Sequence, residues 1–242
     1  QQLSLLTAWP QHEAHTLPQL PPMEKWVSVL QYGAKGDGQT DDTPAFERAL
    51  KENQVVYVPQ GWYRLTSTLN LPKDARLIGL HPFGTQLKLK ESEPAFSGFG
   101  SPVPLVQTAA GGDTQLNGIG INTGAYNYRA AGLKWTAGAD SYLNDVKFVG
   151  GHGTMGKPGV VSANGSYGAR GTGPTVSSPE TPVYNRGQDQ AWDTQYWSLW
   201  ITDNGGGTIK DIWTADTYAA SGLYISNTST EGRIYAISLE HH

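Results

Sequence analysis

The amino-acid sequence predicts an all-β protein folded as a parallel β-helix, a solenoid in which each coil of short strands pairs edge-on with the next. Three observations predict this fold. Turn-forming and aromatic residues are abundant, with 30 Gly, 15 Pro, 8 Trp and 12 Tyr among 242 residues, as expected of many short strands. Apolar strand patterns recur at a fixed spacing in the second half. A single helical pattern precedes them.

The N-terminal part is expected to be an arm followed by a loop and a helix. Residues 1–25 contain Pro and His without periodicity, which indicates an extended arm. A glycine-rich loop at 33–42 leads to a helix at 43–52, capped by Thr40 or Asp41. Short strands are expected at 27–30, 55–58, 63–66, 69–71 and 76–79.

Two strand types then alternate along the chain. The first has the pattern apolar-x-x-apolar and occurs at 116–119, 143–146, 209–212 and 234–237. The second precedes it by ten or eleven residues and occurs at 133–135, 199–201 and 223–225. The repeat spacing of 24 to 27 residues, with strands and without helices, is typical of a parallel β-helix. A leucine-rich repeat would carry a Leu frame with a recurring Asn, and a β-sandwich would show no fixed spacing.

One segment interrupts the repeat. Residues 150–197 hold ten Gly and four Pro and match neither strand type, so we expect a long loop inserted between two strands. Its aromatic C-terminal part indicates either a contact surface or a loop that packs on its own coil. The expected organisation is an arm at 1–25 and a single β-helix domain at 26–242 that contains this insertion.

Composition excludes several classes of protein. Seventeen basic and 21 acidic residues give a net charge of −4, without a basic block, which argues against a nucleic-acid partner. No apolar run approaches the roughly 18 residues of a membrane span. The absence of Cys excludes disulfides, thiolate zinc sites and a cysteine nucleophile.

Three N-terminal stretches form one long pattern: YGAKGDGQTDDTPAF at 32–46, VYVPQGWYR at 56–64 and LIG at 77–79. This pattern resembles the N-terminal module of the pectate-lyase-like superfamily of right-handed parallel β-helix proteins. GLKW at 132–135 and SYLNDV at 141–146 are similar to glycoside hydrolase family 55, a β-helical family related to family 28. The resemblance implies a right-handed β-helix whose N-terminal helix caps the open end of the coil.

The resemblance also implies a function and partners. The superfamily includes polysaccharide lyases, polygalacturonase-like and glucanase-like hydrolases, and phage tailspikes. We expect a polysaccharide substrate and a secreted, periplasmic or cell-surface protein, bacterial in origin. Family 55 enzymes have two β-helices, each with this N-terminal pattern, so this chain corresponds to one half and its partner would be a second half or chain. No metal or cofactor is expected, except Ca²⁺ if the chain is a lyase.

Glycoside hydrolysis requires two carboxyl groups, one acting as acid and one as base or nucleophile. The first candidates are Asp193, which lies among aromatic residues, and Asp203, which follows the strand at 199–201. Glu240 is a third candidate because it follows a strand and precedes two His residues, provided that this end is native and not a purification tag.

Sugar rings present apolar faces on which aromatic side chains stack. Trp192, Tyr196 and Trp197 are therefore candidate sugar platforms, although strand aromatics also serve as core. Arg186 is a candidate binder of hydroxyl or carboxylate groups. His152 is a further candidate, with a backbone-bonded loop histidine as the alternative.

Asp145 and Asp211 occupy the same place in their repeats, so they should project from one face on adjacent coils, about 4.8 Å apart. Such a ladder serves either catalysis or turn formation. The function that we expect is hydrolysis of a β-glucan-like polysaccharide. A lyase acting on a uronic-acid polymer and a non-catalytic, tailspike-like glycan-binding protein are the alternatives.

Overall fold

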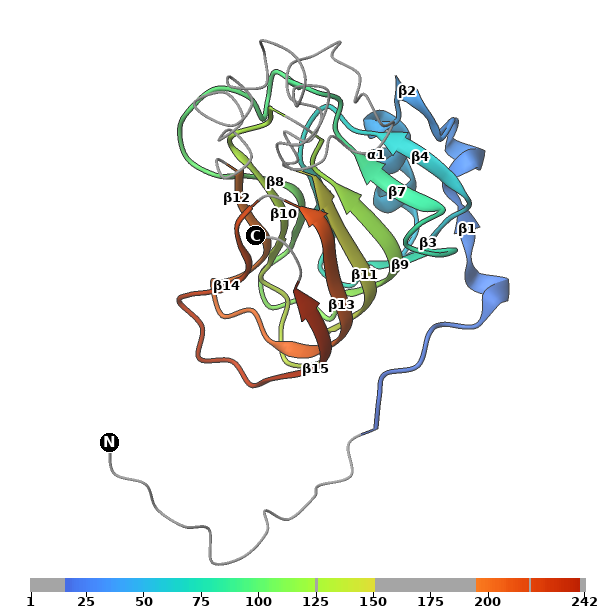
Figure 1. The fold of residues 1–242 in the computed structure, drawn as a ribbon. Helices are drawn as coiled ribbons and strands as arrows, with labels where there is room; N and C mark the ends of the chain where they lie inside the picture. The colour runs from blue at the N-terminus through green and yellow to red at the C-terminus, as the bar shows by residue number, and fades with distance from the viewer. Residues whose placement is uncertain (1–15, 125, 151–194, 218, 240–242) are drawn as a thin grey trace, which may run out of the picture.

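The computed structural model describes residues 16–124, 126–150, 195–217 and 219–239, and every strand pair within them is parallel. The strands stack into two sheets that face each other across the core (Figure 1). This arrangement confirms the predicted parallel β-helix.

Within the described residues, the large sheet has ten strands, and its main path follows the order β1-β3-β6-β9-β11-β13-β15. These strands are β1 (Val27–Ser28), β3 (Val55–Val58), β6 (Arg76–Gly79), β9 (Gln115–Asn122), β11 (Tyr142–Gly150), β13 (Gly207–Thr217) and β15 (Gly232–Leu239). Beside this path lie β2 (Asp37–Asp41), β4 (Gly61–Arg64) and β7 (Thr85–Lys88).

The described part of the small sheet has five strands in the order β14-β12-β10-β8-β5. They are β5 (Leu69–Leu71), β8 (Val103–Thr108), β10 (Ala130–Trp135), β12 (Gln195–Ile201) and β14 (Ala219–Ile225). Gln195 already pairs with β14, so residues 195–197, expected in the insertion, belong to a strand instead.

The register confirms the repeat read from the sequence. The first apolar residues of the apolar-x-x-apolar pattern lie side by side in the large sheet, in the order Leu116, Leu143, Ile209 and Ile234. In the small sheet, Leu133, Leu199 and Leu223 do the same. The core contains five of these residues, Leu116, Leu133, Leu143, Leu199 and Ile209, together with Trp135, Phe148 and their neighbours. Leu223 is partly buried and packs against the core, whereas Ile234 is 38% exposed.

The predicted helix is α1 (Thr43–Glu52), and it closes one end of the solenoid. Its buried face consists of Thr43, Ala45, Phe46, Ala49 and Leu50. The N-cap of the helix is Asp42, not Thr40 or Asp41 as expected, and its side chain makes no capping hydrogen bond. The Asp41 carboxylate accepts a hydrogen bond from the Thr43 backbone N–H at 3.0 Å. The helix contacts β3, β5 and the 3₁₀ helix η2 (Val29–Tyr32).

The glycine-rich loop before α1 is held by Asp42, whose buried carboxylate accepts backbone N–H groups from Lys35 at 2.7 Å and Gly36 at 3.0 Å. Gly36 has φ +61°, and a Cβ there would lie 3.0 Å from the Tyr63 ring, so only glycine fits this turn. These contacts are structural, in agreement with the capping role that the resemblance implies.

The described part of the predicted arm, residues 16–25, runs alongside the N-terminal end of the large sheet and contains the 3₁₀ helix η1 (Met23–Lys25). Gln19 accepts a hydrogen bond through its backbone oxygen from the Gln115 amide at 3.4 Å. No helix among the described residues is long and apolar enough to cross a membrane.

Candidate active site

A column of residues with left-handed backbone runs across the large sheet. Gly118, Asp145, Asp211 and Ala236 occupy equivalent places on β9, β11, β13 and β15, with φ values of 70°, 52°, 51° and 49°. In a regular strand, residues three apart face opposite sides. The left-handed residue changes this phase, so both apolar positions of the pattern point into the core, and the two aspartates project from the outer face.

The Asp145 carboxyl is partly buried and lies among charged groups. Burial raises the pKa of its carboxyl, and the neighbouring Asp211 raises the pKa further. The charges of His81 and Lys210 act in the opposite direction. Asp145 therefore favours the protonated form more than an exposed aspartate does.

Asp211 lies on the adjacent strand and is paired with an ammonium group. Its carboxylate accepts a charge-assisted hydrogen bond from Lys210 Nζ. This hydrogen bond is the main cause that raises the pKa of Lys210. The two aspartates therefore have different surroundings although they share one backbone conformation.

An aromatic cluster lies beside this pair. The ammonium of Lys147 lies 4.0 Å from the ring centroid of Phe83 and 4.5 Å from that of Trp213, and the side chain is only 9% exposed. Phe83 also stacks on the His81 ring at 5.5 Å. Cation–π and stacking contacts thus hold His81 near Asp145.

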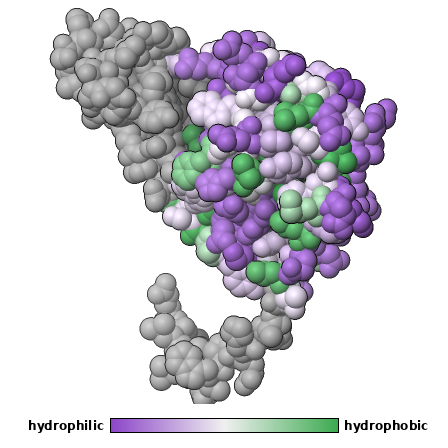
Figure 2. Space-filling model, turned by 90° about the vertical axis from the view of Figure 1, so that its right-hand side faces the viewer, coloured by the Kyte–Doolittle hydropathy of each residue, from purple (hydrophilic) through white to green (hydrophobic). Residues whose placement is uncertain are grey.

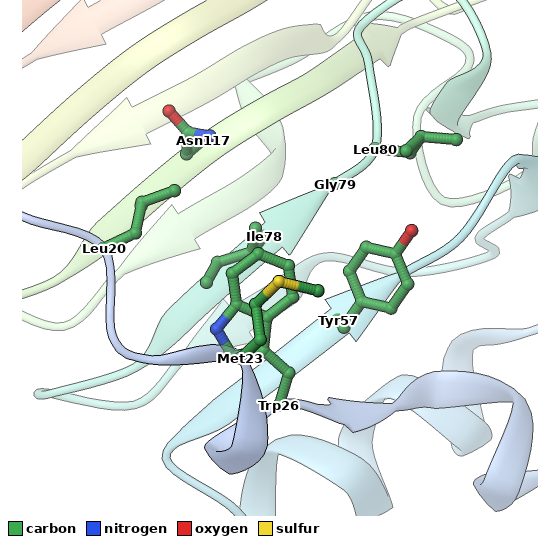
Figure 3. Close-up of a pocket in the computed structure, with 8 residues that line it drawn as sticks. All are labelled: Leu20, Met23, Trp26, Tyr57, Ile78, Gly79, Leu80 and Asn117. Atoms are coloured by element: carbon green, nitrogen blue, oxygen red, sulfur yellow. The ribbon is translucent and has the colours of Figure 1, made fainter.

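A hollow of about 500 Å³ opens on the same outer face, between the arm and the first strands of the large sheet (Figure 3). The arm and the sheet both contribute to its lining, which consists of Leu20, Met23, Trp26, Tyr57, Ile78, Gly79, Leu80 and Asn117. On the face of the molecule nearest the first strands of this sheet, apolar patches alternate with hydrophilic ones (Figure 2).

The aromatic pair in the hollow is fixed in place. The rings of Trp26 and Tyr57 lie 5.4 Å apart at an interplanar angle of 32°. The indole Nε1 of Trp26 donates a hydrogen bond to the Pro21 backbone oxygen at 2.8 Å. At the other side of the hollow, Asn144 donates through its amide nitrogen to the Asn117 side-chain oxygen.

The predicted sugar platforms that the structure describes, Tyr196 and Trp197, lie on β12 of the small sheet. Trp197 stacks on Tyr224 at 4.3 Å and lies 4.8 Å from Trp200, and the Tyr196 hydroxyl donates to the Gly100 backbone oxygen at 2.6 Å. These rings form an aromatic surface, partly exposed to solvent.

Asp203 follows β12, as predicted, and its carboxylate forms an ion pair with Lys134 Nζ at 2.7 Å. Lys134 in turn lies over the Trp200 ring at 4.9 Å. Asp203 thus lies beside the aromatic surface of the small sheet, whereas Asp145 and Asp211 belong to the large sheet.

The remaining predicted site residues lie outside the described part of the chain. They are His152, Arg186, Trp192, Asp193 and Glu240. Within the described residues, no group of three or more His, Cys, Asp or Glu side chains is arranged to hold a metal ion.

Several residues of the outer face were missed in the sequence. His81, Phe83 and Lys147 lie far from Asp211 along the chain, and only the stacking of coils brings them together. One signal was present: Lys147 and Trp213 hold equivalent positions four residues after Leu143 and Ile209. A comparison of the repeats position by position would have placed these two side chains side by side.

Stacked parallel coils, with an N-terminal helix cap and carboxylates on the outer face, define a β-helix protein of the pectate-lyase-like superfamily. More specifically, the chain belongs to the rhamnogalacturonase A/epimerase, pectate lyase-like family, whose model matches residues 26–234.

Individual relatives are similar over parts of the chain. A probable glucan endo-1,3-beta-glucosidase of Arthroderma benhamiae is 38% identical over 94 residues, which are 37% of this chain and 10% of the fungal protein. The pre-neck appendage protein of Bacillus phage B103 is 26% identical over 170 residues, 65% of this chain and 19% of the phage protein. The chain thus spans a fifth or less of either relative.

Among solved structures, an iota-carrageenase of family GH82 from A. fortis superposes with a TM-score of 0.53 and 11% identity, over 96% of this chain and 43% of that one. At this identity the likeness concerns the fold alone.

Proposed function

We propose that the chain is the β-helix part of a secreted glycoside hydrolase that cleaves a β-glucan-like polysaccharide. One observation carries the proposal. Asp145 and Asp211 project from the outer face at equivalent positions of adjacent strands, whose spacing is about 4.8 Å, and their environments differ. Glycosidases need such a pair, with one carboxyl protonated and the other ionised.

The environments suggest how the two roles divide. Asp145, with its raised pKa, would act as the general acid that protonates the leaving oxygen of the glycosidic bond. Asp211, beside the Lys210 ammonium, would act as the ionised base or nucleophile. His81 would orient or hydrogen-bond the substrate near Asp145, because stacking on Phe83 holds its ring there.

The comparisons support a carbohydrate substrate. The matching family is described as rhamnogalacturonase A/epimerase, pectate lyase-like, and two fungal relatives carry glucan 1,3-beta-glucosidase names. The earlier candidates Asp193 and Asp203 remain an alternative carboxylate pair. Tyr196 and Trp197 remain proposed sugar platforms on the small sheet.

A panel of polysaccharides tests the proposal. Laminarin, xylan and polygalacturonate are incubated with the protein and followed for new reducing ends and for absorbance of unsaturated products. We expect reducing ends from laminarin without unsaturated product. Unsaturated product from polygalacturonate would replace the hydrolase proposal with the lyase, and addition of Ca²⁺ or a chelator would then test for a metal requirement.

A second function is favoured by one observation. The match to a phage appendage protein extends over 170 residues, 65% of this chain, so a non-catalytic, tailspike-like glycan-binding role is the competing proposal. Retention of the protein by laminarin in affinity electrophoresis, without either product, would support that role. Turnover of laminarin would exclude it.

A further inference from the structure

We propose that the hollow between the arm and the large sheet is a subsite for a neutral polysaccharide chain, and that Trp26 contacts a sugar ring there. This inference rests on the proposed function, because the glycan bound in the hollow would be the same polysaccharide chain whose glycosidic bond lies at Asp145. The reacting bond and the hollow would then be occupied together by one chain that runs along the solenoid.

The backbone column places the hollow in line with the two aspartates. Where β11 and β13 carry Asp145 and Asp211, the preceding strands carry Gly79 and Gly118. A Cβ on Gly79 would lie 2.3 Å from the Gly118 backbone oxygen, so the close approach of these two strands excludes a side chain. Gly79 lines the hollow and shares its column with Gly118 and Asp145, so Asp145 lies about 10 Å from the hollow, over two strand spacings.

The lining has the chemistry of a sugar subsite. Trp26 and Tyr57 present a large apolar surface whose geometry is set before binding, because the indole is hydrogen-bonded to Pro21, and such preorganised rings bind at low entropic cost. Asn117 accepts from Asn144, while its own amide nitrogen donates to no partner in the described part of the chain. That nitrogen is available to donate to a sugar hydroxyl.

The charge of the lining selects the class of sugar. All eight lining residues are uncharged, so a uronic acid or sulfated ring would lose its hydration without gaining an ionic partner. A neutral sugar avoids this cost. The hollow therefore favours a neutral glucan over an acidic pectin-like polymer.

Binding measured as a function of chain length tests the subsite. β-1,3-gluco-oligosaccharides of increasing length are titrated calorimetrically into the double variant Asp145→Asn, Asp211→Asn, which leaves the ligand uncut. We expect affinity to rise steeply once the chain is long enough to reach the hollow. Adding Trp26→Ala should weaken binding of the long oligosaccharides about tenfold and leave the shortest unchanged.

Trp62→Ala is the matched control, because Trp62 is an exposed tryptophan of β4 that does not line the hollow. Leu80→Glu is a second variant, which tests the hollow without changing Trp26. Leu80 lines the hollow and is exposed, so the substitution should preserve the fold. The introduced negative charge should weaken binding of long chains.

Three binding results would overturn the subsite: equal loss with Trp62→Ala, no dependence on chain length, or tighter binding of oligogalacturonates than of glucans. These failures differ from failure of the proposed function. Length-dependent binding without any turnover by the wild type would retain the subsite and reject the hydrolase. Turnover that Trp26→Ala leaves unaffected at every oligosaccharide length would retain the hydrolase and reject the subsite.

Discussion

Three of the described aspartates, Asp42, Asp37 and Asp145, have different roles, and the surroundings of each carboxyl distinguish these roles. Asp42 is buried, and although it accepts two backbone N–H groups, burial is the main cause that raises its pKa. Asp37 is exposed, and its carboxylate stabilises its own turn by accepting nearby backbone N–H groups. Asp145 is neither fully buried nor satisfied by backbone donors, and its shift comes from burial and from nearby charged groups. Of these three described aspartates, Asp145 has the environment that fits the acid role proposed for it.

Asp37 provides a test at this scale. Its carboxylate accepts the Gln39 and Thr40 N–H groups and the Thr40 hydroxyl, and these bonds, the one from Gln39 foremost, lower its pKa from 3.8 to about 2. The stability that it contributes is therefore present above pH 3.8 and is lost as the pH falls through about 2.

We therefore expect Asp37→Asn to lower the Tm at pH 7 and to leave it nearly unchanged at pH 2. Asp140→Asn is the control, because Asp140 is exposed and its carboxylate has no hydrogen bond within the described residues. The account of this turn fails if Asp37→Asn has the same effect on Tm at both pH values.

At the scale of the element, the apolar-x-x-apolar pattern is a strand with a left-handed residue inside it. Two apolar residues three apart bury together only because residue three of the pattern has positive φ, as Asp145 and Asp211 do. Glycine satisfies this requirement in β9 at Gly118, and alanine tolerates it in β15 at Ala236. Asp or Gly at the third position of the pattern therefore indicates a left-handed backbone. Asp at this position also supplies a carboxylate.

The last position of the pattern predicts how stability varies along the solenoid. Ile212 on β13 and Ile237 on β15 are paired neighbours in the same column, but Ile212 is 1% exposed and Ile237 is 37% exposed. Ile212→Ala should lower the free energy of unfolding by about 2–5 kcal/mol, and Ile237→Ala by less than half as much. Chemical denaturation measures both values, and equal losses would mean that another segment covers β15.

At the scale of the whole molecule, the sequence predicted the coils better than the surface. The spacing of apolar residues was enough to align Leu116, Leu143 and Ile209 in one ladder. In a solenoid, each coil contributes residues to the core at equivalent positions, so the core positions recur along the sequence. It also aligned Asp145 with Asp211. The hollow was not predictable in this way, because Trp26 belongs to a non-repeating arm whose position depends on contacts with distant strands.

Contacts between segments that are distant in sequence also distinguish the candidate carboxylate on the small sheet from those on the large sheet. Asp203 was a candidate because it directly follows the strand at 199–201, and the structure gives it Lys134 as a partner from the adjacent strand β10. Asp145 acquires His81 from a distant turn after β6. Contacts between coils, which sequence neighbours do not reveal, decide which carboxylate has the environment of an acid.

The most direct test compares three aspartate variants for release of reducing ends from laminarin. Asp145→Asn and Asp211→Asn should each lower the initial rate by about 10²–10⁴-fold, while Asp203→Asn, which removes only the charge facing Lys134, should stay near the wild-type rate. Loss of turnover in Asp203→Asn, with Asp145→Asn and Asp211→Asn still active, would contradict the account and move the chemistry to the small sheet.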